Sequence, residues 1–245
     1  MKTGASIVAP IDVLLINVGS NSNEKNGIGP IYGDGSFEYV PIEENRPGRR
    51  TPRFRDLKIR CKYPDLYAHY DPCFEPRPTY GDIRDVPAVR SLNESIKLGG
   101  KPMLLFAATL KHKEDSSLRA SWILDGVGYY IIGFFLIKEI RFASNDGTMN
   151  WPRHEHNAHY RRPHHDKGII KILIEGDQGS RLLKKPFPIS ERPKSRLEPI
   201  SWLRRNFREL RGGPIGEGPW YRRTFRNAPS TNSESILEEF AQHEE

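Results

Sequence analysis

The chain has 245 residues, with 36% hydrophobic and 28% charged side chains, a formal net charge of +7 and a pI near 9.4. This length permits one large domain or two small ones with a real hydrophobic core. No apolar run is long enough to span a bilayer, and "IVAPIDVLLI" near the N-terminus lacks a signal-peptide cleavage site. We therefore expect a soluble, cytoplasmic protein without a membrane partner. Nothing in these numbers indicates an oligomeric state.

The first part of the chain predicts two strands. Apolar residues run together at 11–17, and aromatic residues alternate with polar ones at 36–42, as in a half-buried strand. Between them, Asp34-Gly35 is typical of a tight hairpin turn, because glycine accepts the positive φ that such turns need. Residues 43–64 are rich in Pro and Arg and have weak periodicity, which predicts an exposed connector.

A helix is predicted at 86–98, where apolar residues recur at helical spacing between Pro87 and a pair of glycines. Four later apolar runs predict strands at 103–110, 120–124, 128–142 and 168–176. In the third of these runs, Gly133 indicates a bulge or the close approach of another backbone. Residues 201–210 predict a helix with a basic face, and "TNSE" at 231–234 predicts the capping box of a short final helix.

Together these elements predict an α+β fold with a mostly antiparallel, barrel-like sheet and a few short helices. We expect three units along the chain. They are an α+β core domain at 1–180, a basic C-terminal segment packed on that core at 181–230, and a short acidic tail helix at 231–245.

The distribution of charge favours a polyanionic partner. Residues 181–226 contain thirteen Lys and Arg against four Glu, and residues 46–60 contain seven bases against one acid. The last fifteen residues carry five Glu and no Lys or Arg. Such asymmetry is typical of a surface that binds nucleic acid, with an acidic tail that competes for it, although a solvated basic surface is the plainer alternative.

The stretch "RHEHNAHYRRPHH", at 153–165, contains five of the eight histidines of the chain. Guanidinium groups suit phosphate oxygens, and tyrosine or histidine rings stack on bases, so this stretch predicts nucleic-acid contacts. The residues expected to make them are Arg153, His156, Asn157, His159, Tyr160, Arg161 and Arg162. A metal site, acid–base chemistry and an ordinary polar loop are the alternatives.

Two further groups of residues predict contacts with nucleic acid. Arginines alternate with aromatic residues in the predicted basic helix and in "PWYRRTFR", a combination that joins charge with stacking. The residues are Arg204, Arg205, Arg208, Tyr221, Arg222 and Arg223. Trp122, Tyr129 and Tyr130 are candidates for a base pocket, with packing in the core as the alternative, because Tyr129 and Tyr130 point to opposite faces of a strand.

A histidine and several carboxylates lie close together in "HYDPCFEPRPTYGD", at 69–82. His69, Asp71 and Asp82, with His156 or His159, are candidate catalytic residues, because such groups hold a metal that activates water or act as an acid–base pair. Loop carboxylates that cap turns are the structural alternative.

Several of these stretches resemble one family. The segment "LLINVGSNSNEKNGIGPIYGDGSFEYVPIEE", the block at 69–82, "NAHYRR" and "SRLLKKPFPIS" are similar to motifs of the nucleotide modification associated domain 3 (Nmad3) family. The resemblance implies an association with DNA modification and restriction systems. In addition, "LGGKPMLLFAATL" and "GYYIIGFFLIKEI" resemble the core hairpin of PUA-like domains, which implies a pocket beside the sheet for a modified or flipped base.

We therefore predict a nucleic-acid-binding protein that recognises a modified base or nucleotide, with DNA or RNA as partner and with no cofactor or metal. One alternative is a metal- or acid–base-dependent enzyme that modifies or cleaves nucleotides. Another is an accessory protein of RNA or ribonucleoprotein.

Overall fold

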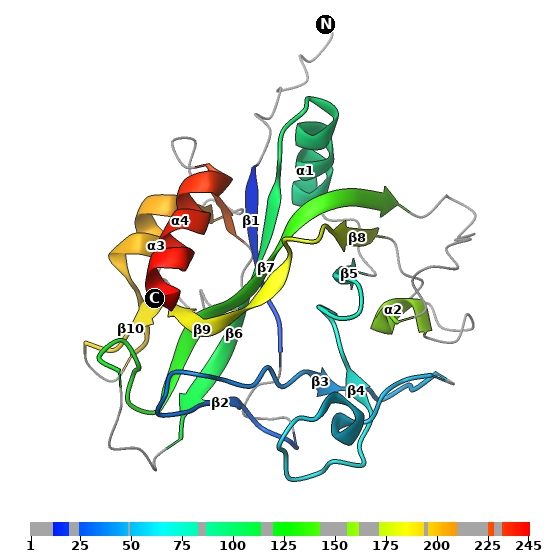
Figure 1. The fold of residues 1–245 in the computed structure, drawn as a ribbon, viewed down its shortest axis with the longest axis vertical. Coiled ribbons are helices and arrows are strands. Elements are labelled where there is room, and N and C mark those ends of the chain that lie inside the picture. Colours follow the sequence, from blue (N-terminus) through cyan, green and yellow to red (C-terminus); the bar gives the residue numbers. More distant parts are fainter. Residues whose placement is uncertain are drawn as a thin grey trace, which may run out of the picture.

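The computed structural model describes the chain in ten stretches, residues 12–19, 25–48, 50–82, 87–113, 120–142, 156–161, 172–193, 196–209, 225–227 and 232–245. One nine-stranded sheet organises them (Figure 1). Its strands are β1 (Val13–Asn17), β2 (Gly29–Ile31), β5 (Thr79–Asp82), β6 (Met103–His112), β7 (Val127–Phe142), β8 (Ile172–Gly176), β9 (Arg181–Pro188), β12 (Phe207–Glu209) and β13 (Phe225–Asn227).

The sheet is mixed and open. Its order is β12-β13-β1-β6-β7-β8-β5, with β2 added to β6 and β9 added to β7. Strands β1 and β2 run parallel to β6, whereas the other pairs in this sheet are antiparallel. The predicted α+β class and mostly antiparallel pairing are confirmed. The barrel-like closure is wrong: within the described stretches the edge strands β12 and β5 do not pair with each other.

Strand β7 is the longest element, and two different groups of strands share it. Its first half pairs with β6 and β9, and its second half pairs with β8. The pairing of β7 with β6 and its pairing with β9 both shift register between Ile131 and Gly133. A Cβ on Gly133 would lie 2.7 Å from the carbonyl oxygen of Arg181 and 2.8 Å from the ring of Phe74. Both sequence expectations for Gly133, a bulge and a close approach, are thus confirmed.

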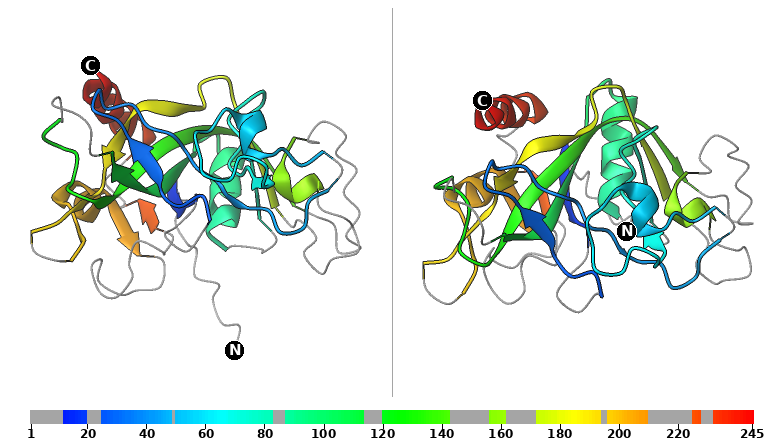
Figure 2. Two further views of the ribbon diagram at one scale, coloured as in Figure 1. Left: turned by 90° about the horizontal axis from the view of Figure 1, so that it is seen from below. Right: turned by 60° about the horizontal axis from the view of Figure 1, so that its bottom comes forward.

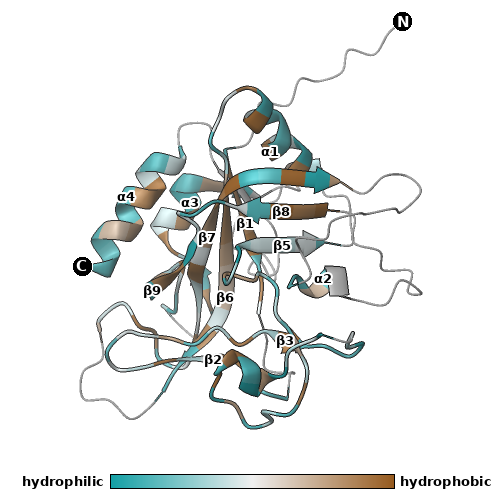
Figure 3. Ribbon diagram, turned by 45° about the vertical axis from the view of Figure 1, so that its right-hand side comes forward, coloured by the Kyte–Doolittle hydropathy of each residue, from teal (hydrophilic) through white to brown (hydrophobic). Residues whose placement is uncertain are grey.

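Each face of the sheet carries its own hydrophobic core, because alternate side chains of a strand point to opposite faces. Helix α1 (Pro87–Lys97) supplies Val89 and Leu92 to one core. Helices α3 (Ser201–Asn206) and α4 (Ser233–Glu244) supply the other, through side chains such as Trp202 and Phe240. In Figure 3 the central strands carry the hydrophobic colours, while α1 and α4 alternate between hydrophilic and hydrophobic.

The helices at 86–98 and near the C-terminus were predicted, with one correction. Helix α1 begins at Pro87 and ends before Gly99, which has φ +81°, and α4 is capped by the side chain of Asn232. The helix predicted at 201–210 ends at Asn206, and the chain continues as β12. Pairing with β13 satisfies the backbone there, and Phe207, only 1% exposed, joins the core.

The excursion between residues 40 and 70 is more ordered than the exposed connector that the sequence predicts. It contains β3 (Ile42–Glu43), the short helix η1 (Phe54–Leu57) and β4 (Ala68–His69), which pairs with β3. Phe54 is buried with Val40 and Ala68 in a third, small cluster, and this hydrophobic anchor explains the order.

Two strand predictions are wrong. Residues 36–42 form only an isolated bridge, between Phe37 and Ile31, and a β3 residue at their end. Residues 120–124 form a turn, in which Ile123 is buried without joining a strand. The remaining elements are α2 (Ala158–Arg161), β10 (Ser190–Glu191) and β11 (Glu198–Pro199). No helix in the described part of the chain has the length and apolar character needed to cross a membrane.

Candidate metal centre

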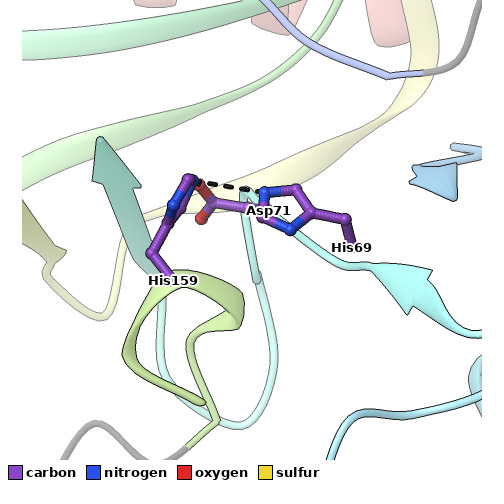
Figure 4. Close-up of side chains that lie close together, drawn as sticks. All are labelled: His69, Asp71 and His159. Atoms are coloured by element: carbon purple, nitrogen blue, oxygen red, sulfur yellow. Dashed lines mark hydrogen bonds and ion pairs between the residues drawn. The ribbon is translucent and has the colours of Figure 1, made fainter. Parts of the chain in front are cut away.

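Three side chains from two distant segments of the chain converge beside the sheet (Figure 4). His69 ends β4, Asp71 follows it by two residues, and His159 lies on α2. All three are largely buried, with side-chain exposures of 7%, 2% and 12%. The ligand atoms of the three residues lie within 4.8 Å of one another. The sequence names all three as candidate catalytic residues, and the structure brings them together.

Two of the separations between these atoms match the coordination of a metal ion. The Nε2 atoms of His69 and His159 are 3.2 Å apart, and Nε2 of His159 is 3.3 Å from the Asp71 carboxylate. Ligands at about 2.0–2.1 Å from a tetrahedral zinc ion lie about 3.3–3.4 Å from one another. Two imidazoles and one carboxylate are also the ligand set of non-haem iron sites and of many catalytic zinc sites.

The Glu44 side chain orients His69 from behind. Its carboxylate lies 2.7 Å from Nδ1 of His69, and Glu44 is only 5% exposed. A carboxylate accepts a hydrogen bond, so Nδ1 of His69 carries a proton, and Nε2, which lies 3.2 Å from Nε2 of His159, is the ring atom that faces the centre. This carboxylate–histidine arrangement is the usual second layer of a metal site, where it fixes the tautomer and the ring orientation.

The Asn157 side chain connects the other two residues. Its Nδ2 donates to Oδ1 of Asp71 at 3.1 Å, and its Oδ1 accepts from the backbone N–H of His159 at 2.9 Å. The backbone N–H of Gly81, in β5, also donates to the Asp71 carboxylate. Asn157 is fully buried, so water does not compete for these bonds. The position of α2 relative to β5 and Asp71 is thereby set by one amide group.

The centre requires a positive charge or a proton where its atoms meet. The 3.2 Å contact between Nε2 of His69 and Nε2 of His159 places two nitrogens close together beside the Asp71 carboxylate. Either a proton on His159 or a cation relieves the repulsion between their lone pairs. Among the described residues, Nδ1 of His159 is buried without a hydrogen-bond partner.

Two tyrosines, one buried and one half-buried, also lie beside Asp71. The hydroxyl of Tyr39 donates to the backbone carbonyl of Asp71 at 2.8 Å. Burial, and then the negative charge of Asp71, raise the pKa of Tyr39 well above its usual range, so this hydroxyl remains a donor. Burial likewise raises the pKa of the neighbouring Tyr70. These groups stabilise the turn that carries Asp71.

Other predicted site residues lie elsewhere. Asp82, at the end of β5, is half-buried and is not one of the three converging residues. His156 contacts the backbone carbonyl of Arg77 through Nε2. Tyr160 and Arg161 belong to α2. The predictions for Arg153, Arg162, Tyr221, Arg222 and Arg223 lie outside the described residues.

The basic residues of α3 and β12 lie far from the centre. Arg204, Arg205 and Arg208 are exposed. In all three views, α3 and α2 lie at opposite sides of the molecule (Figures 1 and 2). The contact with nucleic acid expected of these three arginines stays a prediction.

The aromatic residues predicted to form a base pocket mostly pack inside the protein. Tyr129 and Tyr130 are each 1% exposed and belong to the cores on opposite faces of β7. Trp122 is half-buried, packs against Tyr130 and contacts His243 of α4. This corresponds to the alternative of core packing for the two tyrosines.

Two residues that orient the ligands were not predicted to do so from the sequence. Glu44 was not named, although it closes the "PIEE" stretch that resembles the family's N-terminal motif. Asn157 was expected to contact nucleic acid, whereas its buried amide holds Asp71 and His159. The signal available in the sequence was the pair of spacings His69-x-Asp71 and Asn157-x-His159.

Comparison with known proteins agrees with the motifs noted in the sequence. No curated protein and no solved structure matches the chain significantly. The family model for the nucleotide modification associated domain 3 matches residues 12–242, which include all the residues of the centre. The chain therefore belongs to the Nmad3 family, which associates it with nucleotide modification.

Proposed function

We propose that this protein is a metal-dependent enzyme that acts on nucleotides or nucleic acid, with His69, Asp71 and His159 as the metal ligands. The observation that carries the proposal is the convergence of three ligand atoms within 4.8 Å of one another, with Glu44 behind His69. Family membership supports the substrate class.

Among the described residues three ligands converge, which is the number found in catalytic zinc sites, and we infer a catalytic role from it. Structural zinc sites are closed by four protein ligands, whereas catalytic sites have three and leave a position open. A metal held in this way polarises a water molecule or a substrate oxygen. Asn157 and Glu44 orient the ligands, which is the support that such a site requires.

Binding of a modified base without catalysis is the second candidate, and the charge distribution favours it. It predicts that affinity for nucleic acid does not depend on divalent cations and that no product forms. The three converging side chains are mostly buried and lie away from the exposed α3 arginines. A role in binding alone therefore does not explain why they converge.

The test begins with metal binding. Protein stripped with a chelator is titrated calorimetrically with Zn²⁺, with Mn²⁺ and, without oxygen, with Fe²⁺. We expect about one equivalent of one of these ions to bind, and we expect His69→Ala and His159→Ala to abolish that binding. Glu44→Gln, which removes only the orienting charge, should weaken binding by roughly 10–100-fold.

His156→Ala is the matched control, because His156 lies three residues before His159 and outside the converging set. Its metal affinity should equal that of the unmodified protein. The proposal is wrong if no ion binds, or if His159→Ala and His156→Ala bind metal equally well. Once the ion is known, release of product from modified and plain oligonucleotides is assayed with and without it.

A further inference from the structure

A basic loop lies directly beside the candidate metal centre. We use this name for residues 46–60, which belong to the excursion between β3 and β4. They contain seven Lys and Arg and one Asp. The paired strands at the base of the excursion include Ile42 opposite His69, so the loop leaves the fold at the metal centre itself.

One carboxyl group links the loop to the centre. Oε2 of Glu44 lies 2.7 Å from the His69 ring, and Oε1 accepts a hydrogen bond from the backbone N–H of Arg46 at 2.9 Å. The backbone N–H of Glu44 donates to the carbonyl of Tyr67, in the returning half of the excursion. The start of the loop is therefore fixed relative to His69.

The rest of the loop is held by its own contacts. Phe54 is 1% exposed in the third hydrophobic cluster. The Arg53 guanidinium donates to the carbonyl of Asp65 and to the hydroxyl of Tyr67, and it lies 4.6 Å from the centre of the Tyr67 ring. The backbone N–H of Gly48 donates to the Thr51 hydroxyl. These contacts hold the described backbone of the loop in place, and its charged side chains project from that backbone.

Several of those charges face solvent. Arg46, Arg50 and Lys58 are exposed, and so are Arg55 and Arg60, which pair with acidic residues. Exposed pairs are weak, so anionic groups of a ligand can compete for these two arginines. Figures 1 and 3 show the chain after β3 extending on the same side of the molecule as α2, which carries His159.

We propose that the basic loop is the phosphate-binding surface that holds a nucleic-acid strand at the metal centre, so that the substrate is a polynucleotide and not a free nucleotide. The proposal rests on the proposed function. A free nucleotide carries its phosphates at one end, whereas several exposed cations spread along a loop that begins at the centre match the repeated phosphates of a strand. Guanidinium groups suit that contact because they bind phosphate oxygens in pairs.

The test compares the two basic surfaces of the molecule. Arg46→Glu/Arg50→Glu reverses two charges of the basic loop, and Arg204→Glu/Arg205→Glu reverses two on α3. Binding of labelled single-stranded DNA and RNA of equal length is followed by fluorescence anisotropy at 50 and 200 mM salt. A mononucleotide at matched phosphate concentration serves as competitor.

We expect the loop variant to bind oligonucleotide at least roughly tenfold more weakly, with a salt slope smaller by about 1.4 for two lost contacts to a single strand. The α3 variant should bind within about twofold of the unmodified protein, and the mononucleotide should not compete. The DNA and RNA arms identify which polymer supplies the phosphates.

Metal titration of the same variants separates this inference from the proposed function. Unchanged metal affinity in a loop variant that has lost oligonucleotide binding supports it. Equal oligonucleotide binding by the loop variant and the unmodified protein overturns it, and so does full competition by the mononucleotide. If His159→Ala loses metal binding but keeps its oligonucleotide affinity, the loop remains the binding surface. If the unmodified protein binds no metal at all, that result contradicts only the proposed function.

Discussion

At the scale of single residues, Asn157 has an unusual position. One buried amide binds the carboxylate of Asp71 through its nitrogen and the backbone of His159 through its oxygen. The two ligands are separated by 88 positions in the sequence. A buried side chain that satisfies both groups at once stabilises their relative position, and its loss leaves a buried donor and a buried acceptor with fewer partners.

We predict that Asn157→Ala weakens metal binding by roughly 10–100-fold without unfolding the protein, because the ligands remain but their orientation is lost. Isothermal titration with the ion identified above measures the effect, and circular dichroism checks the fold. Asn157→Asp is the informative companion, because it retains the acceptor for the His159 N–H but places a second carboxylate against Asp71. Metal affinity equal to that of the unmodified protein in both variants would contradict the role assigned to Asn157.

The residues of the centre were partly predictable. His69, Asp71 and His159 have side chains that bind metals, and they lie in blocks that resemble family motifs, so residue type and motif sufficed to name them. Asp82 also has a carboxylate side chain, but it lies at the end of β5 and does not join the converging residues. Residue type alone does not distinguish it from Asp71, because the difference depends on how the chain runs between β4 and β5. Glu44 required knowledge of the pairing between β3 and β4, which brings two distant segments together.

At the scale of elements, β7 connects the two halves of the sheet, and its pairing is irregular at two points. One register shift lies beside Gly133, within the part that pairs with β6 and β9, and the other lies between Ile137 and Glu139, in the part that pairs with β8. Phe74, three residues after Asp71, packs against the open side of Gly133. The Phe74 ring, and with it the segment that carries Asp71, packs into space that a side chain on residue 133 would occupy.

We predict that Gly133→Ala destabilises the protein by about 1–3 kcal/mol, because the added methyl group meets the Arg181 carbonyl and the Phe74 ring. Urea unfolding measures the free energy. Combining it with Phe74→Leu should recover part of the loss only if the ring is one of the two obstacles. A single variant as stable as the unmodified protein would show that the backbone adjusts freely at this point.

Local patterns predicted some elements well and failed where pairing is distant. The strands β6 and β7 and the helix α1 follow from apolar runs and helical spacing within one segment. The end of α3 does not, because residues 207–209 extend in order to pair with β13. The barrel was wrong for the same reason, since closure depends on whether two edge strands meet, and no local pattern encodes that contact.

At the scale of the whole molecule, α4 closes one face of the sheet, and ionisable groups hold its last turn. His243 contacts the Pro186 carbonyl through Nε2 and packs against the rings of Trp122 and Phe187. Burial, together with the positive charge of Lys185, lowers the pKa of His243 below its ordinary value of 6.5, although the Pro186 carbonyl and Glu244 act in the opposite direction. Burial alone would raise the pKa of Glu244, but Arg181 and the backbone N–H of Lys184 lower it overall.

These shifts predict a loss of stability on acidification. Between the folded and unfolded pKa of His243 the unfolded chain binds more protons, so stability falls as the pH drops below about 6.5. We expect His243→Gln to lose less stability than the unmodified protein between pH 7.5 and 5.5, as measured by thermal unfolding. The stability that Glu244 contributes is present at neutral pH and is lost only below about pH 4.5, because its pKa in the folded protein lies below that value. Parallel pH profiles for the two proteins would contradict this assignment.

The position of β1 in the sheet has a consequence for how the protein is made. β1 lies between β6 and β13, and β13 is near the far end of the described chain. During synthesis β1 therefore lacks its second neighbour until more than 200 further residues have been made. Pairings over such long separations form slowly, and an apolar strand with an open edge is prone to aggregate meanwhile. We expect production of this protein to depend strongly on chaperones, and chains that stop before β13 to accumulate as aggregates.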